Sequence, residues 1–294
     1  MPKVEEVQRY AFADVQTLVF AGGGNRCWWQ AGALRHLMER GMRMPTQLIG
    51  TSAGAAVAAS FLTGSSDAAL ATCLRLYAEN ARIFSWSGLS SLKLKFAHQH
   101  VYPAWLEAFI NTATFDALRD SSSRLTVALT RPAKLLGMGG SIAAGTLAYL
   151  VDKYLWNSIH PRLPKMFGLR QDFVVLNECA GVEEAQSLLI AAASAPPIMS
   201  SRTIGKSRAI DGGYTDNAPI PQQSVDEKSK TLVLLTRHYP QLPRLFLFAG
   251  RTYWQPSQRV PVSTWDCTAK TTVREACDLG LQDAVYALST GLIC

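Results

Sequence analysis

Short apolar runs alternate along the chain with longer stretches in which apolar residues recur every three or four positions. The short runs are mostly rich in Val, Ile, Leu and Phe, as strands buried on both faces are. They predict strands over Gln16–Phe20, Gln47–Gly50, Leu125–Leu129, Phe173–Leu176, Arg208–Ile210 and Thr231–Leu235. The longer stretches predict helices over Arg26–Met38, Ala53–Leu62, Ala69–Asn80, Ala104–Leu118, Glu183–Ala193 and Thr272–Leu288. This alternation predicts an α/β fold with a mostly parallel central sheet and helices on both of its faces.

The chain has 294 residues, 48% of them hydrophobic, which is enough for one large domain. No interior stretch has the composition of a linker, and no repeat is visible. We therefore expect a single domain over residues 1–294. Its motifs fall within residues 16–220, and residues 221–294 are expected to add a C-terminal strand and helices.

Three glycine-centred motifs each follow a predicted strand, at the edge where sites form in parallel sheets. The sequence Gly50-Thr51-Ser52-Ala53-Gly54 fits the G-x-S-x-G pattern, in which a serine nucleophile sits on a tight turn from strand to helix. The flanking Gly50 and Gly54 would allow the backbone to approach closely on either side. Ser52 is therefore the candidate nucleophile.

The sequence Gly22-Gly23-Gly24-Asn25-Arg26 opens the first predicted helix. Successive glycine N–H groups can point at one oxygen atom and form an oxyanion hole, and Arg26 could add positive charge beside it. A plain turn and a dinucleotide-binding loop are the alternatives. The dinucleotide loop is disfavoured because Cys27 occupies its third glycine position and no acidic residue stands near Met44.

The sequence Asp211-Gly212-Gly213 follows the strand expected at residues 208–210. An Asp-Gly pair is often only a turn, but here the carboxylate would be held at a strand end. Together the three motifs supply an oxyanion hole, a nucleophile and a base. That set is sufficient for ester hydrolysis without histidine.

The order of these motifs resembles the patatin-like phospholipases, which carry a Gly-Gly-Gly-x-Arg loop, a G-x-S-x-G elbow and a late Asp-Gly-Gly. An Ala-Ser-Ala-x-Pro-type segment from Ala193 to Pro197 adds to the resemblance, and residues 253–266 look like the C-terminal part of bacterial members. The resemblance implies a three-layer α/β/α fold and a Ser52–Asp211 dyad, with an oxyanion hole at Gly22, Gly23 and Gly24. Gly212 would support the turn after Asp211. Cys27 departs from the family, which often has glycine there.

The same resemblance implies phospholipase A-type cleavage of phospholipid esters at a membrane surface, without metal or other cofactor. It also implies that a ligand or partner protein activates some members. Two rivals remain: an α/β-hydrolase with a Ser-Asp-His triad completed by His238, and a lipid-binding protein of patatin shape without turnover. The oligomeric state, the acyl position and the head group are left open.

The net charge of +7 weakly favours anionic partners, but no compact Lys/Arg run indicates nucleic-acid binding. The six cysteines show no paired spacing and the first 16 residues lack a signal-peptide pattern, so we expect a cytoplasmic protein, peripherally membrane-associated if it acts on lipid. Leu135–Val151 is uncharged, which fits a core helix, a lid or a membrane-contacting segment. Ser91–Phe109 mixes basic and aromatic residues, which fits either a head-group interface or an ordinary packed helix.

Overall fold

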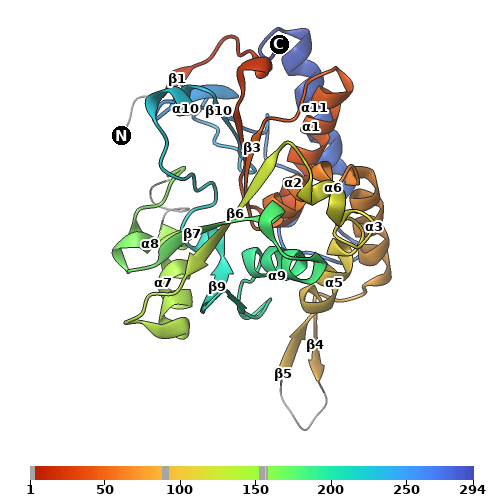
Figure 1. Cartoon of the computed structure of the whole chain (residues 1–294), viewed down its shortest axis with the longest axis vertical. Coiled ribbons are helices and arrows are strands. Elements are labelled where there is room, and N and C mark those ends of the chain that lie inside the picture. The colour runs from red at the N-terminus through yellow and green to blue at the C-terminus, as the bar shows by residue number, and fades with distance from the viewer. Residues whose placement is uncertain (1–3, 88–92, 152–155, 157) are drawn as a thin grey trace.

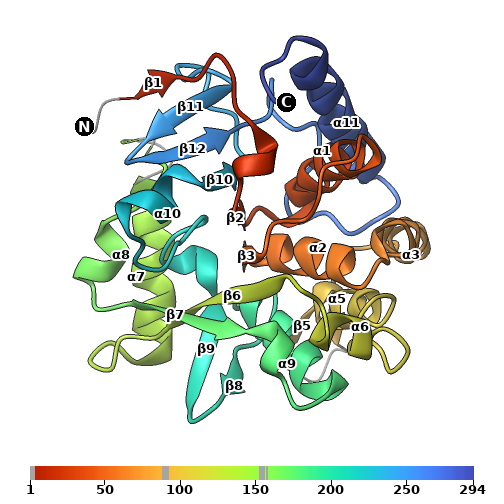
Figure 2. The same ribbon diagram turned by 45° about the horizontal axis from the view of Figure 1, so that its top comes forward.

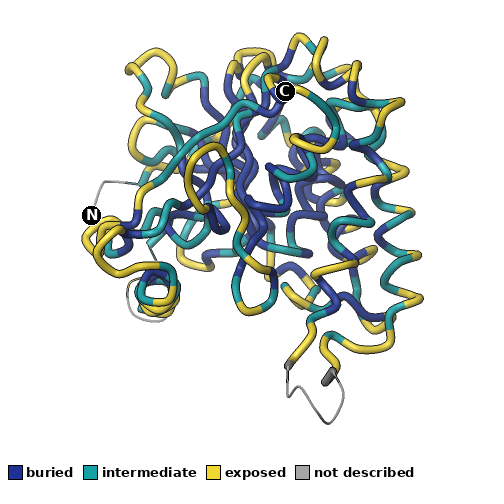
Figure 3. Tube along the Cα trace, turned by 60° about the horizontal axis from the view of Figure 1, so that its bottom comes forward, coloured by how far each residue is buried: buried dark blue, intermediate teal, exposed yellow. Residues whose placement is uncertain are grey.

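The computed structural model describes residues 4–87, 93–151, 156 and 158–294 (Figure 1). Within them, ten strands form one sheet in the order β1-β11-β12-β10-β2-β3-β6-β9-β8, and β7 also pairs with β6. Those strands are β1 (Glu5–Glu6), β2 (Thr17–Phe20), β3 (Gln47–Thr51), β6 (Arg124–Arg131), β7 (Arg170–Val175), β8 (Arg202–Ile204), β9 (Ser207–Asp211), β10 (Thr231–Leu234), β11 (Leu245–Phe248) and β12 (Arg251–Trp254). A separate hairpin of β4 (Phe84–Ser87) and β5 (Lys93–Phe96) projects from the body of the protein (Figure 3). The central strands of the large sheet are buried inside that body.

The centre of the sheet is parallel, as the sequence predicts. Strands β12, β10, β2, β3 and β6 run in the same direction, and the outer strands are antiparallel to their neighbours. Every residue of β2 and β10 is buried, which explains their unbroken apolar runs.

Helices cover both faces of this sheet (Figure 2). They are α1 (Trp28–Glu39), α2 (Ala53–Leu62), α3 (Ser66–Glu79), α5 (His98–Leu106), α6 (Phe115–Arg119), α7 (Gly137–Val151), α8 (Leu163–Met166), α9 (Val182–Ala192), α10 (Val225–Ser229) and α11 (Val273–Ser289). Helices α1, α2 and α11 lie on one side, and α7, α8 and α10 on the other. The predicted three-layer α/β/α architecture is confirmed.

The C-terminal part of the chain is built into the same sheet. Strands β10 and β12 belong to its parallel centre, and α11 packs along α1. Gly32 of α1 and Gly280 of α11 face the partner helix so closely that a Cβ atom on either would collide with its backbone. Glycine at both positions therefore lets the two helices touch.

One prediction of local structure was wrong. The helix expected over Ala104–Leu118 is instead α5 and α6, because the Asn111 side chain accepts hydrogen bonds from the N–H groups of Ala113 and Thr114 and turns the chain between them. The strands predicted over Phe173–Leu176 and Arg208–Ile210 are confirmed as β7 and β9, and both run antiparallel to β6. For β9 this reversed direction decides how Asp211 reaches the site.

The basic and aromatic segment Ser91–Phe109 divides into two parts, and its first residues, 91 and 92, lie outside the described residues. Val101, Trp105 and Phe109 are buried against the core, so this part is an ordinary packed segment. Lys95 is exposed on the β4–β5 hairpin. Among the described residues, no helix has the length and apolar character to span a bilayer.

Candidate active site

Ser52 occupies a sharp turn between β3 and α2. Its backbone has φ 54° and ψ −135°, a conformation that residues with a side chain rarely adopt. Both flanking glycines are required by space: a Cβ at Gly50 would collide with Ala55, and one at Gly54 would lie 2.6 Å from the carbonyl oxygen of Ala21. The strand, the strained serine and the two glycines are the features of a nucleophile elbow.

Asp211 is brought to Ser52 by the pairing of β6. Thr51, the last residue of β3, pairs with Ala128, and Asp211 pairs with Leu129, the next residue of β6. Strand β7 pairs along one edge of β6, so β3 and β9 share the opposite edge. On that edge β9 begins to pair just beyond the end of β3. The Ser52 hydroxyl therefore donates a hydrogen bond of 2.6 Å to Oδ2 of Asp211, across 159 residues of sequence.

The rest of the Asp211 carboxylate is also fixed. Its Oδ1 accepts a 2.7 Å hydrogen bond from the Gly213 N–H, and its own N–H donates to the Ser194 carbonyl at 2.8 Å. Gly212 lets this turn approach β6, because a Cβ there would lie 2.6 Å from the Ala128 carbonyl oxygen. The lone pair directed at Ser52 is therefore held in one orientation.

Burial raises the pKa of Asp211 to about 6, against the opposing effect of the hydrogen bonds from Ser52 and Gly213. Its side chain lies almost wholly out of contact with solvent. A carboxylate with this pKa is largely ionised at pH 7 and accepts a proton more readily than a free aspartate does.

The glycine loop lies beside Ser52, and its three glycines differ in what they offer. The Gly22 N–H donates to the Asn217 carbonyl at 2.7 Å, and the Gly22 carbonyl accepts a 2.6 Å hydrogen bond from the Thr236 hydroxyl. Gly22 therefore anchors the loop, and its donor is already engaged. Within the described part of the chain, the N–H groups of Gly23 and Gly24 have no partner.

Gly24 has a φ of +55°, and a Cβ atom there would collide with the Thr264 backbone. Only glycine fits this position without strain. Arg26 donates from Nε to the Gly23 carbonyl at 3.3 Å and lines the cavity in front of the loop. The loop thus places two unpaired N–H donors and one cation close to Ser52.

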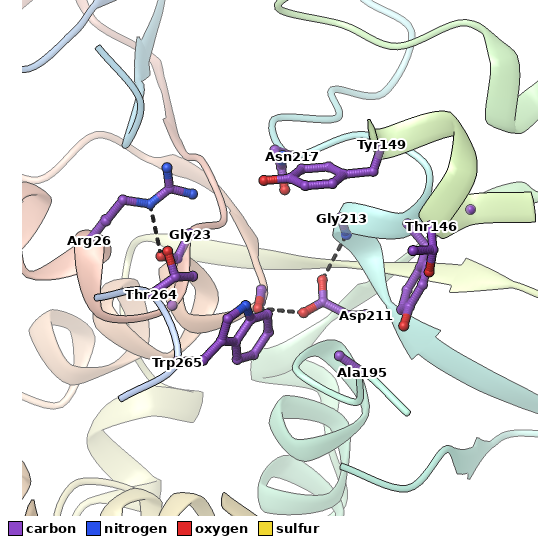
Figure 4. A pocket seen from close by; sticks show the side chains of 14 residues that line it. Gly23, Arg26, Thr146, Tyr149, Ala195, Asp211, Gly213, Asn217, Thr264 and Trp265 are labelled. Atoms are coloured by element: carbon purple, nitrogen blue, oxygen red, sulfur yellow. Dashed lines mark hydrogen bonds between the residues drawn. The ribbon is translucent and has the colours of Figure 1, made fainter. Parts of the chain in front are cut away.

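A cavity of about 330 Å³ opens in front of Ser52 and Asp211 (Figure 4). The glycine loop and Arg26 form one wall, and α7 forms another through Gly145, Thr146 and Tyr149. Trp265, far along the chain, closes the cavity from a third side.

A comparison with protein families matches residues 18–222 to the patatin-like phospholipases. The chain belongs to this family. Among solved structures, VipD from Legionella pneumophila is similar at 13% sequence identity and a TM-score of 0.38, over 75% of this chain and 49% of VipD. The chain thus aligns with about half of VipD. No curated protein matches the chain.

The patatin-like site also has a second, smaller cavity of about 50 Å³, which Ser52 lines as well. Its walls are mostly apolar or aromatic and include Val57, Trp105 and Met199. Tyr102 also lines this cavity, and its buried hydroxyl has no hydrogen-bond partner in the described structure. Both cavities meet at Ser52, so an ester bound there would have one part on each side.

His238 does not join this patatin-like site. Its Nδ1 lies 2.9 Å from the Pro256 carbonyl oxygen, and neither Ser52 nor Asp211 is among its hydrogen-bond partners. The alternative of a Ser-Asp-His triad completed by His238 is therefore wrong. Among the residues that the structure describes, no group of His, Cys, Asp and Glu could hold a metal ion, and all six cysteines are free thiols.

Several residues of the patatin-like site were not expected from the sequence. They are Tyr149, Asn217, Thr236, Thr264 and Trp265. Asn25 ties the segment that contains Thr264 and Trp265 to the glycine loop. Its side-chain amide donates to the carbonyls of the flanking residues Ser263 and Asp266, at 2.9 and 2.6 Å. The only sequence signal for this wall is the resemblance of residues 253–266 to bacterial members of the family.

Proposed function

We propose that this protein is a serine lipid acyl hydrolase of the phospholipase A type, which cleaves carboxylic ester bonds of membrane phospholipids. The observation that carries the proposal is the 2.6 Å hydrogen bond from Ser52 to Asp211, beside the unpaired N–H groups of Gly23 and Gly24. Membership of the patatin-like phospholipases supports the same class of reaction.

The reaction begins when Ser52 Oγ attacks the carbonyl carbon of the ester and Asp211 Oδ2 accepts the serine proton. The carbonyl oxygen becomes an oxyanion, which the N–H groups of Gly23 and Gly24 stabilise. One such donor contributes roughly 3–4 kcal/mol to the transition state. Collapse of the intermediate breaks the bond to the alcohol, and Asp211 returns the proton to the leaving oxygen.

The acyl group is then carried on Ser52 as an ester. A water molecule gives its proton to Asp211 and attacks the acyl carbon, and the proton returns to Ser52 when the fatty acid leaves. The sum is one ester and one water converted into one acid and one alcohol. No metal or redox partner is needed for any of these steps.

The two cavities divide the substrate. We assign the narrow apolar cavity to the start of the acyl chain, and the larger cavity, with Arg26 on its wall, to the glycerol and phosphate part. Gly24 and Ser52 line both cavities, and Gly23 lines the larger one.

To test this proposal, the wild-type protein and the Ser52→Ala variant are incubated with mixed phospholipid vesicles, and the products are identified by mass spectrometry. We expect free fatty acid and lysophospholipid from the wild type alone, and the lysophospholipid isomer identifies the acyl position. Release of fatty acid by both proteins would contradict the role of Ser52. Vesicle binding without product, together with no turnover of small chromogenic esters, would favour a lipid-binding protein of patatin shape.

A further inference from the structure

Helix α7 has two unlike faces. Gly145, Thr146 and Tyr149 line the cavity in front of Ser52, and Ser141, Gly145 and Ala148 are its only buried residues. The remaining side carries no charged residue over the whole helix. The helix is therefore a wall of the active site on one side and a free surface on the other.

That free surface is apolar where an ordinary surface helix is charged. Leu147 is 56% exposed and Leu150 43%, and Leu135, in the turn before the helix, is fully exposed. Helix α8 packs beside α7 and adds Met166, which is 78% exposed. We call this set the α7–α8 apolar face; its members are Leu135, Leu136, Leu147, Leu150, Met166 and Phe167.

The described charged residues of the segments that form this face are basic. Among the described residues from 133 to 171, the exposed charged side chains are four basic ones; Asp152, the one acidic residue of this stretch, lies outside the described residues. They are Lys134, Arg162, Lys165 and Arg170. An apolar face with a basic border fits the interface of a bilayer that contains anionic lipids.

We propose that the α7–α8 apolar face docks the protein on an anionic lipid surface. The leucines enter the boundary between head groups and acyl chains, and the basic residues contact the lipid phosphates. Since the opposite side of α7 lines the cavity at Ser52, docking brings the cavity next to the membrane. The role of this docking in catalysis rests on the proposed function, whereas the measurement of docking itself does not.

The test measures binding of the Ser52→Ala protein, which cannot turn over lipid, to sedimented vesicles of phosphatidylcholine with or without phosphatidylglycerol. We expect binding to the anionic vesicles that weakens as salt is raised. The double substitution Leu147→Asp/Leu150→Asp should lower the partition coefficient at least about tenfold, and so should Lys134→Glu/Lys165→Glu.

Val285→Asp is the matched control, because this valine is 43% exposed on α11, which lies on the other side of the sheet from α7 and α8. This variant should bind like the parent, and thermal unfolding checks that every variant is folded. The proposal is overturned if the two double variants bind anionic vesicles as the parent does. It is also overturned if size-exclusion chromatography shows that the leucines instead hold two copies of the chain together.

Because binding is read in a protein without the nucleophile, these results stand whether or not the wild type hydrolyses phospholipid. Failure of hydrolysis with binding intact would count against the proposed function alone. Loss of binding specificity with hydrolysis intact would count against this docking face alone.

Discussion

Ser52 and Asp211 share one hydrogen bond because their strands pair with neighbouring residues of β6. Thr51 pairs with Ala128, and Asp211 pairs with Leu129. The hydrogen-bonded pair is therefore fixed by the register of the sheet and does not depend on a mobile loop. We therefore expect the chemistry of the site to follow the ionisation of the Asp211 carboxylate.

The rate should depend on pH through Asp211. Its pKa is raised to about 6, and only the ionised form can accept the Ser52 proton. With a water-soluble ester, we expect kcat/KM to level off above pH 7 and to fall about tenfold per pH unit well below pH 6. A profile that stays flat from pH 7 down to pH 4.5 would show that Asp211 is not the base.

The substitution Asp211→Asn should reduce kcat by about 10³-fold or more while making the fold more stable at neutral pH. The pKa of this carboxyl is higher in the folded state than in the unfolded chain. Ionised Asp211 therefore lowers the free energy of unfolding by up to about 3 kcal/mol. This cost is absent below about pH 4 and fully present above about pH 6.

Unfolding by urea at pH 4 and at pH 7.5 measures this effect. The stability of the Asn variant relative to wild type should be greater at pH 7.5 than at pH 4. An equal difference at the two pH values would mean that the carboxyl is not strained by its burial.

Thr236 is a positioning residue, because its hydroxyl donates to the Gly22 carbonyl and so fixes the glycine loop. Thr236→Val leaves that buried carbonyl without its donor, at a cost of about 1–3 kcal/mol. We expect kcat to fall by about tenfold or more with little change in KM, and Thr236→Ser to restore most of it. If valine and serine lowered kcat equally, the hydroxyl would have no part in holding the loop.

His238→Ala should retain activity to within about twofold of wild type, because His238 lies against the Pro256 carbonyl and not at the dyad. Loss of the histidine of a catalytic triad, in contrast, costs several orders of magnitude. Steady-state kinetics on the same soluble ester decide between these outcomes.

The local part of the site could be predicted from the sequence. A G-x-S-x-G turn needs glycines that the adjacent strand and helix crowd, and Gly50 and Gly54 are crowded in this way. The apolar runs of β2, β3 and β10 identified the centre of the sheet, since strands buried on both faces leave a signal in consecutive residues.

Contacts between distant segments could not be predicted in this way. The antiparallel entry of β9, the hydrogen bond from Gly22 to Asn217 and the wall made by Trp265 depend on pairings across the fold. The hydrophobic pattern of residues 135–151 also did not decide whether this helix lies in the core or at the surface. A charge-free helix has the same sequence pattern in a core and at a lipid surface, and only its exposure separates the two.

The central claim is that Ser52 carries the acyl group during turnover. The most direct measurement is mass spectrometry of the protein quenched during reaction with a slowly deacylated ester, followed by peptide mapping. We predict an acyl adduct on the peptide containing Ser52 in the wild type, none in Ser52→Ala, and slower formation in Asp211→Asn. An adduct on another residue, or turnover by Ser52→Ala, would contradict the account.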